Sequence, residues 1–101
     1  MSFERIDQDQ ALGLINNESA IVVDVRDAES YAEGHIRNAL HLTQDSLGEF
    51  VSATNKTLPI IVCCYHGNSS QGAADFLNQQ GFDRCYSLDG GFTAWQSAGL
   101  E

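Results

Sequence analysis

The sequence has little positive charge. Its 101 residues include 5 lysines and arginines against 14 aspartates and glutamates, which gives a formal net charge of −9. Nucleic acids and anionic membranes bind basic surfaces, so this balance argues against both as partners. No apolar run reaches membrane-spanning length, and the first residues lack the basic-then-apolar pattern of a secretory signal. We therefore expect a cytoplasmic protein that binds neither nucleic acid nor membrane.

Cysteine is also sparse. The chain has 3 cysteines, and two of them, Cys63 and Cys64, are adjacent. An odd number with this spacing argues against a disulfide framework and favours a reducing compartment. Closely spaced pairs of histidine and cysteine do not recur along the chain, so the sequence predicts no metal site.

Proline occurs once, and hydrophobic residues make up 43% of the chain. This composition is typical of a globular protein, and the length is that of one domain, here expected to cover residues 1–101. Short apolar runs predict strands near residues 3–6, 20–25, 39–42, 60–64 and 84–88. Helical patterns lie between and after them, near 7–17, 27–33, 43–53, 69–80 and 92–98. Strands that alternate with helices predict a three-layer α/β/α sandwich around a parallel sheet.

Several local signals refine these elements. Asp7 with Gln10 three residues later predicts a capping box at the start of the first helix. Thr43 or Asp45 is expected to open the third helix. In the helix near 69–80, the buried face is predicted to carry Ala73, Phe76 and Leu77.

The most informative stretch of the sequence is residues 60–70. A β-branched run ends at Cys64, and small or polar residues then lead into a helix. Such a loop directs backbone N–H groups and the positive end of a helix dipole at one point. Because this environment stabilises a thiolate, it lowers the pKa of a cysteine. We expect Cys64 to be a nucleophile in an anion-binding loop.

The expected binding residues are the six that follow Cys64: Tyr65, His66, Gly67, Asn68, Ser69 and Ser70. Gly67 suits a backbone conformation that other residues resist. Asn68, Ser69 and Ser70 are candidates for side-chain hydrogen bonds to a bound anion, although Ser69 or Ser70 could instead serve as a helix cap. His66 is expected at the rim of the site rather than as a general base.

The other two cysteines are predicted to be structural. Side chains alternate along a strand, so Cys63 should point to the face opposite Cys64. Cys85 lies near the start of its strand, ~10 Å from the strand ends. Arg26 could bind an anion or form a salt bridge that braces the loops, and the salt bridge is favoured.

Four segments, in this order, resemble the rhodanese family over essentially the whole chain. They are Val23–Arg26, Tyr31–Ile36, Cys64–Ser70 and Leu88–Phe92, the last followed by Trp95. The cysteine loop is most similar to that of single-domain thiosulfate sulfurtransferases of the GlpE type. The resemblance implies a five-stranded parallel sheet and sulfur transfer through a persulfide on Cys64, with no cofactor or metal.

The resemblance also implies the substrates. Thiosulfate would donate the sulfur, and cyanide or a thiol such as thioredoxin would accept it. Two alternatives remain: a sulfur-relay protein that takes sulfur from a protein persulfide, and a non-catalytic rhodanese-like binding module. A phosphatase with a similar cysteine loop would need an arginine at the end of that loop, where this chain has Ser70.

Overall fold

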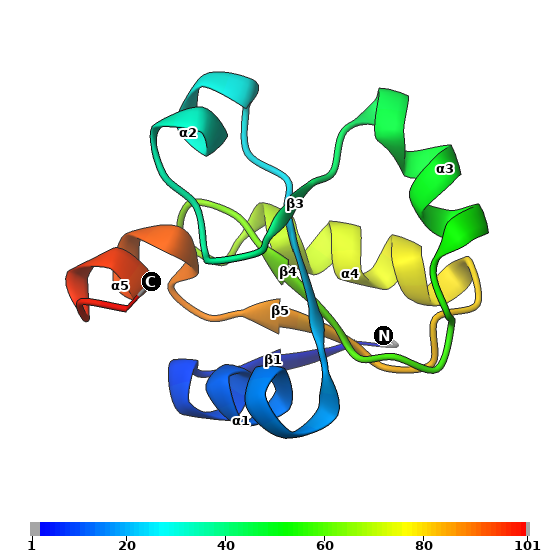
Figure 1. Cartoon of the computed structure of the whole chain (residues 1–101), viewed down its shortest axis with the longest axis horizontal. Helices are drawn as coiled ribbons and strands as arrows, with labels where there is room; N and C mark the ends of the chain where they lie inside the picture. The colour runs from blue at the N-terminus through cyan, green and yellow to red at the C-terminus, as the bar shows by residue number, and fades with distance from the viewer. Residues whose placement is uncertain (1–2, 101) are drawn as a thin grey trace.

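The computed structural model describes residues 3–100, so the two ends of the expected 1–101 unit lie outside the described residues. Within this range one sheet contains five strands, all paired in parallel, in the order β1-β5-β4-β2-β3. The strands are β1 (Glu4–Ile6), β2 (Ile21–Asp24), β3 (Leu40–His41), β4 (Ile60–Cys63) and β5 (Cys85–Leu88). The helices are α1 (Gln8–Glu18), α2 (Ala28–Glu33), α3 (Gln44–Ala53), α4 (Ser69–Gln79) and α5 (Gly91–Ser97). The predicted α/β fold with a five-stranded parallel sheet is confirmed (Figure 1).

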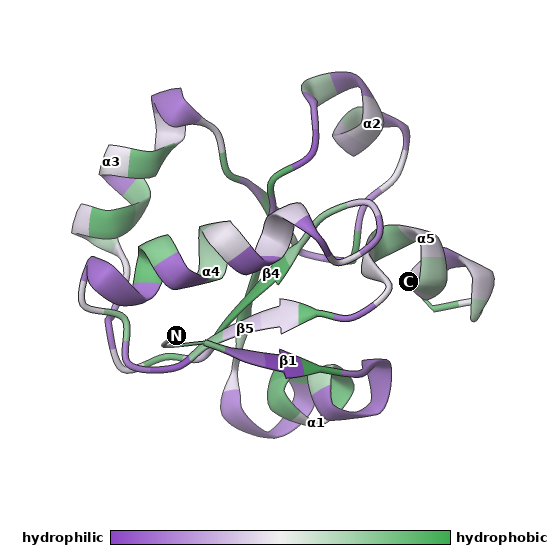
Figure 2. Cartoon of the chain, turned by 180° about the vertical axis from the view of Figure 1, so that it is seen from behind, coloured by the Kyte–Doolittle hydropathy of each residue, from purple (hydrophilic) through white to green (hydrophobic). Residues whose placement is uncertain are grey.

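Each face of the sheet packs against its own apolar cluster. On one face Ile61 and Cys63 lie with Ala11 of α1 and Trp95 of α5. The other face packs against α3 and α4 through these residues: Val23, Ile60, Val62, Phe50, Ala74 and Leu77. All four residues of β4 are buried, as expected for a central strand covered on both sides. Figure 2 shows β4 as hydrophobic, whereas the ribbons of α1, α3 and α4 mix hydrophobic and hydrophilic residues.

The predicted helix starts are present. The Asp7 carboxylate accepts a hydrogen bond from the Gln10 backbone N–H at 2.8 Å, and the Asp7 N–H donates to the Gln10 side chain at 2.9 Å. Thr43, not Asp45, caps α3. Helix α1 continues one residue past Asn17, where the sequence predicted its end.

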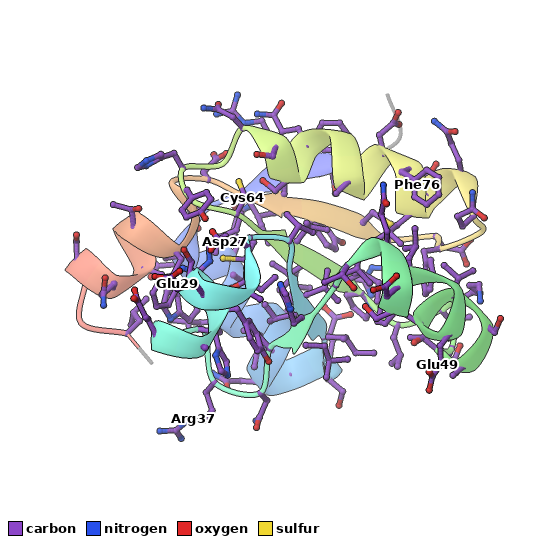
Figure 3. All side chains as sticks on the ribbon, turned by 90° about the horizontal axis from the view of Figure 1, so that it is seen from above. Asp27, Glu29, Arg37, Glu49, Cys64 and Phe76 are labelled. Atoms are coloured by element: carbon purple, nitrogen blue, oxygen red, sulfur yellow. The ribbon has the colours of Figure 1, made fainter. Side chains whose placement is uncertain are left out.

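The buried face of α4 differs from the prediction. Its buried residues are Ser70, Ala74 and Leu77, whereas Ala73 is half-buried. Phe76 is 41% exposed, so its predicted burial is wrong; Figure 3 labels its side chain on α4. Successive residues turn by about 100°, which puts Ala74 and Leu77 beside Ser70 and Phe76 about 120° away. The helix is therefore rotated so that Ser70 faces inward.

All the strands end at the same edge of the sheet because they run parallel. The segments that follow β2, β4 and β5 therefore meet there, and so does the start of α4 (Figure 1). Ligands of open parallel sheets bind beyond this edge. No helix within residues 3–100 is long and apolar enough to cross a membrane.

Candidate active site

Cys64 follows β4 directly and is only 2% exposed. The Gly67 backbone N–H donates a hydrogen bond to its Sγ at 3.1 Å. The Ser70 hydroxyl oxygen lies 3.2 Å from the same sulfur. Ser70 in turn lies 2.7 Å from the hydroxyl oxygen of Ser87 on β5. The sulfur therefore sits where the loop after β4, the first turn of α4 and strand β5 meet.

The surroundings of Cys64 favour its ionised form. Burial raises the pKa of the thiol and opposes ionisation. Hydrogen bonds from the Ser70 hydroxyl and from the backbone N–H groups of Ser70, Gly67 and His66 outweigh burial, so the pKa lies below its ordinary value. Helix α4 starts at Ser69, so the positive end of its dipole lies at the same place. The acidified thiol that the sequence predicts is confirmed.

The other two cysteines have the opposite character. Cys63 is fully buried in the cluster beneath α1 and α5, and burial raises its pKa to about 12. Cys85 is 3% exposed, and burial raises its pKa to about 11. Both thiols stay protonated near neutral pH, which agrees with the structural role predicted for them.

The start of α5 holds the backbone of the cysteine loop. The Phe92 N–H donates to the Cys64 carbonyl at 2.8 Å, and the Thr93 N–H donates to the Tyr65 carbonyl at 3.1 Å. Gly91 directly precedes Phe92 and has a φ of +59°, and a Cβ atom there would be 2.4 Å from the Cys64 carbonyl oxygen. Only glycine allows α5 to approach the loop this closely.

Among the predicted binding residues, Gly67 and Ser70 lie within hydrogen-bond distance of the sulfur. Gly67 has a φ of +95°, the conformation for which the sequence suggested a glycine. The side chains of three others are exposed: His66, Asn68 and Ser69. Asn68 occupies the N-cap position of α4 but makes no capping hydrogen bond with its side chain.

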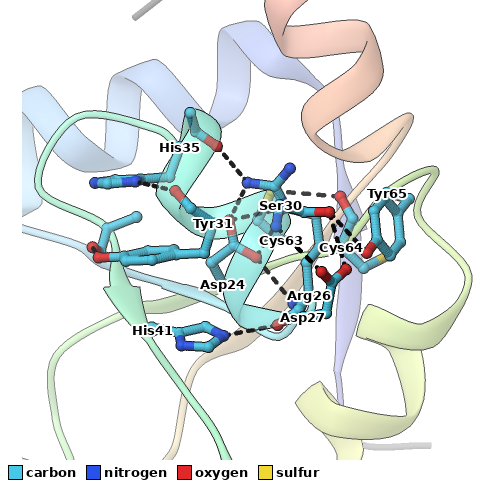
Figure 4. A network of polar contacts seen from close by, with 12 residues as sticks. Asp24, Arg26, Asp27, Ser30, Tyr31, His35, His41, Cys63, Cys64 and Tyr65 are labelled. Carbon is cyan, nitrogen blue, oxygen red and sulfur yellow. Dashed lines mark hydrogen bonds and ion pairs between the residues drawn. The ribbon is translucent and has the colours of Figure 1, made fainter.

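Tyr65 joins the cysteine loop to α2. Its ring is 41% exposed, and its hydroxyl lies 3.1 Å from the Ser30 hydroxyl oxygen (Figure 4). Ser30 also donates to the carboxylate of Asp27, which caps α2. The contact with Ser30 therefore fixes the hydroxyl end of the Tyr65 side chain.

Arg26 braces the loops instead of facing the sulfur. It is 7% exposed, lies 2.8 Å from the Asp24 carboxylate and donates to the Gly34 carbonyl at 2.6 Å (Figure 4). Its guanidinium carbon lies 4.3 Å from the centroid of the Phe92 ring. The salt bridge favoured by the sequence is confirmed, with Asp24 as the partner.

Sequence reasoning missed Ser87. This serine is fully buried in β5, opposite Val62 of β4, and hydrogen-bonds to Ser70. A polar residue in a buried strand was the available signal, because such a group needs a partner inside the protein. No cluster of three or more His, Cys, Asp or Glu side chains suited to a metal ion occurs in the part of the chain that the structure describes.

The comparisons with known proteins agree with this geometry. Residues 7–98 match the rhodanese-like domain family. The chain belongs to the rhodanese family. Among rhodaneses, it is 50% identical over 95 residues to the thiosulfate sulfurtransferase GlpE of Pseudomonas putida (strain GB-1), an alignment that covers 94% of this chain and 86% of that protein.

Two solved rhodanese structures have the same fold. A rhodanese-related protein from Thermoplasma volcanium superposes with a TM-score of 0.81 at 26% identity, covering 98% of this chain and 96% of that one. A rhodanese-like domain protein from Staphylococcus aureus gives a TM-score of 0.80 at 29% identity, covering 98% and 97% of the two chains. The rhodanese fold therefore spans nearly all of the present chain.

Proposed function

We propose that this chain is a thiosulfate sulfurtransferase that carries sulfur as a persulfide on Cys64. The observation that carries the proposal is the acidified thiol, held by the Gly67 N–H and the Ser70 hydroxyl. The 50% identity to a thiosulfate sulfurtransferase over most of the chain supports the same conclusion. We also propose that the protein works in the cytoplasm, since its free, unpaired cysteines suit a reducing compartment.

The first half-reaction is a displacement at sulfur. The Cys64 thiolate attacks the outer sulfur of thiosulfate, and a new S–S bond forms at Sγ. The S–S bond of thiosulfate breaks, and its electron pair leaves with sulfite. The products are a persulfide anion on Cys64 and sulfite, so the total charge is conserved.

The loop supplies a preorganised cradle for the persulfide charge. Backbone N–H groups of the loop, among them that of Gly67 at 3.1 Å from Sγ, would hold this charge, and such donors need no reorganisation during the reaction. His66, Asn68 and Ser69 are exposed at the rim, where they would meet the arriving donor and acceptor. The loop has no arginine or lysine, and Arg26 is engaged by Asp24, so donor binding depends on amides and hydroxyls.

The second half-reaction returns the free thiolate. Cyanide, or the thiolate of an acceptor such as thioredoxin, attacks the outer sulfur of the persulfide. The bond between the two sulfurs breaks, and its electron pair returns to Sγ of Cys64. Cyanide then leaves as thiocyanate, and a thiol acceptor leaves as its own persulfide.

Intact mass spectrometry without reductant tests the proposal directly. Thiosulfate should add one sulfur atom to the protein, and cyanide should then remove it as thiocyanate. Cys64→Ser should abolish the gain, whereas Cys63→Ala and Cys85→Ala should retain most of it. If the folded wild-type protein gained no sulfur, thiosulfate would not be its donor, and a protein persulfide donor or a binding role would be favoured. If the Cys63→Ala variant were folded but inactive, the nucleophile would be Cys63 and not Cys64.

A further inference from the structure

A buried chain of hydroxyl groups ends at the reactive sulfur. Ser70 and Ser87 are both fully buried, their hydroxyl oxygens lie 2.7 Å apart, and Ser70 lies 3.2 Å from Cys64 Sγ. Within residues 3–100, the Ser87 hydroxyl has no hydrogen-bond partner other than Ser70. Ser87 makes no hydrogen bond to the sulfur within residues 3–100, so its hydrogen-bonding effect on Cys64 passes through Ser70.

The number of hydrogens available for hydrogen bonds among Cys64, Ser70 and Ser87 depends on the charge of Cys64. With the thiol protonated, Cys64, Ser70 and Ser87 carry three hydrogens for the two hydrogen bonds that join them, so one hydrogen has no acceptor among the three groups. With the thiol ionised, Ser87 donates to Ser70 and Ser70 donates to the sulfur. Two hydrogens then serve two hydrogen bonds. Because an unpaired buried donor is costly, the two hydroxyl groups favour the ionised state of Cys64 over the neutral one.

We propose that Ser87 is a positioning residue, which orients the Ser70 hydroxyl as a donor to Cys64 and so favours the thiolate. The inference rests on the proposed function only in taking Cys64 as the reactive cysteine.

The sheet holds Ser87 in the required place. Ser87 pairs in register with Val62, two residues before Cys64, so the three side chains point to the same side of the sheet. That side is covered by α4, whose first turn carries Ser70. Because both strands are fully buried, the hydroxyl of Ser87 has little freedom to move away.

Other titratable and charged groups belong to the elements packed around the loop. They include Asp24 and Arg26 at the end of β2, Asp27 and Glu29 at α2, Cys63 of β4, Tyr65 and His66 of the loop, Asp75 of α4, Cys85 and Tyr86 of β5, and Asp89 after β5. A substitution at Ser87 leaves every one of them in the protein. A changed titration of Cys64 in such a variant therefore reports on the hydroxyl pair.

The test is the pH dependence of alkylation of Cys64 by iodoacetamide, read by peptide mass spectrometry on the whole folded protein. Below the pKa of Cys64, Ser87→Ala should react about three- to tenfold more slowly than wild type, the loss of one hydrogen bond. The two rates should converge at high pH, where Cys64 is ionised in both. Cys85→Ala is the matched control, because it removes one atom from the same face of the same strand without touching Ser70; its profile should match wild type.

A double-mutant cycle separates positioning from general damage. Because Ser87 acts through Ser70, adding Ser87→Ala to Ser70→Ala should slow alkylation no further. Ser87→Thr, which keeps the hydroxyl, should restore the wild-type profile. Additive effects of the two alanine substitutions, an unshifted Ser87→Ala profile, or equal slowing at every pH would overturn the proposal. Alkylation needs no sulfur donor, so this result is independent of whether thiosulfate is the substrate.

Discussion

At the scale of single residues, Cys63 and Cys64 are neighbours in the chain, but their side chains meet different surroundings. Cys63 lies in the apolar cluster under α1 and α5, where burial raises its pKa to about 12. Cys64 turns to the other side and meets the Gly67 N–H and the Ser70 hydroxyl, which help to lower its pKa. The reactivity of the thiol is therefore set by hydrogen-bond donors and not by burial alone.

This contrast predicts selective alkylation. In the folded protein near neutral pH, iodoacetamide should modify Cys64 at least about a hundredfold faster than Cys63 or Cys85, because only the thiolate reacts. In denaturant all three cysteines should react at similar rates. Peptide mass spectrometry after short exposures measures each site, and equal labelling of Cys63 and Cys64 in the folded protein would contradict the assigned surroundings.

At the scale of elements, the contact between α5 and the cysteine loop positions the site. Two N–H groups at the start of α5 hold the carbonyls of Cys64 and Tyr65, and Gly91 allows this approach. Helix α4 acts from the other side, since its rotation turns Ser70 toward the sulfur and leaves Phe76 exposed. The loop is thus held between two helix N-termini.

Substitution of Gly91 tests this arrangement. Gly91→Ala would place Cβ 2.4 Å from the Cys64 carbonyl oxygen, so α5 or the loop must shift. We expect the free energy of unfolding to fall by about 1–3 kcal/mol. The rate of thiocyanate formation should fall on the order of tenfold to a hundredfold, because the reacting sulfur is displaced. Urea unfolding and an initial-rate assay measure the two effects.

Gly48→Ala is the matched control for Gly91→Ala. Gly48 lies in α3 with open space around its Cβ position. Its replacement should leave the rate unchanged and raise the free energy of unfolding by about 0.5–1 kcal/mol, the gain expected for alanine over glycine in a helix. Full activity and stability in Gly91→Ala would show that the close approach of α5 is not needed.

At the scale of the whole molecule, the charge opposes the proposed substrate. The chain carries a formal charge of −9, whereas thiosulfate is a dianion. Three of the arginines are already paired with carboxylates: Arg5 with Asp89, Arg26 with Asp24 and Arg84 with Glu18. Long-range repulsion should therefore weaken donor binding, and dissolved salt should screen it, with a Debye length of about 10 Å at 0.1 M.

This repulsion predicts an unusual salt dependence. The KM for thiosulfate should fall as sodium chloride rises from about 0.01 to 0.2 M, because screening weakens the repulsion. Alkylation of Cys64 by neutral iodoacetamide should not change over the same range, which separates donor attraction from any change in the thiol. A KM that rises steeply with salt would show that a local positive site, and not the amide cradle, binds the donor.

Interactions between residues that are close in the sequence explain which features could be predicted from the sequence alone. The capping box of Asp7 and Gln10 needs only residues three apart, and the opposite orientation of Cys63 and Cys64 follows from the alternation of side chains along any strand. Strand type and the position of Cys64 at a strand end follow from apolar runs and the polar loop that interrupts them.

The tertiary structure alone decided the features that depend on distant segments. The strand order pairs β1 with β5, at opposite ends of the chain. Ser87 meets Ser70 only because β5 lies beside β4, and Phe76 is exposed only because α4 turns Ser70 inward. A pattern of residue types describes which side chains share a face of one element. It does not say which other element will cover that face, since this depends on packing that the whole chain determines together.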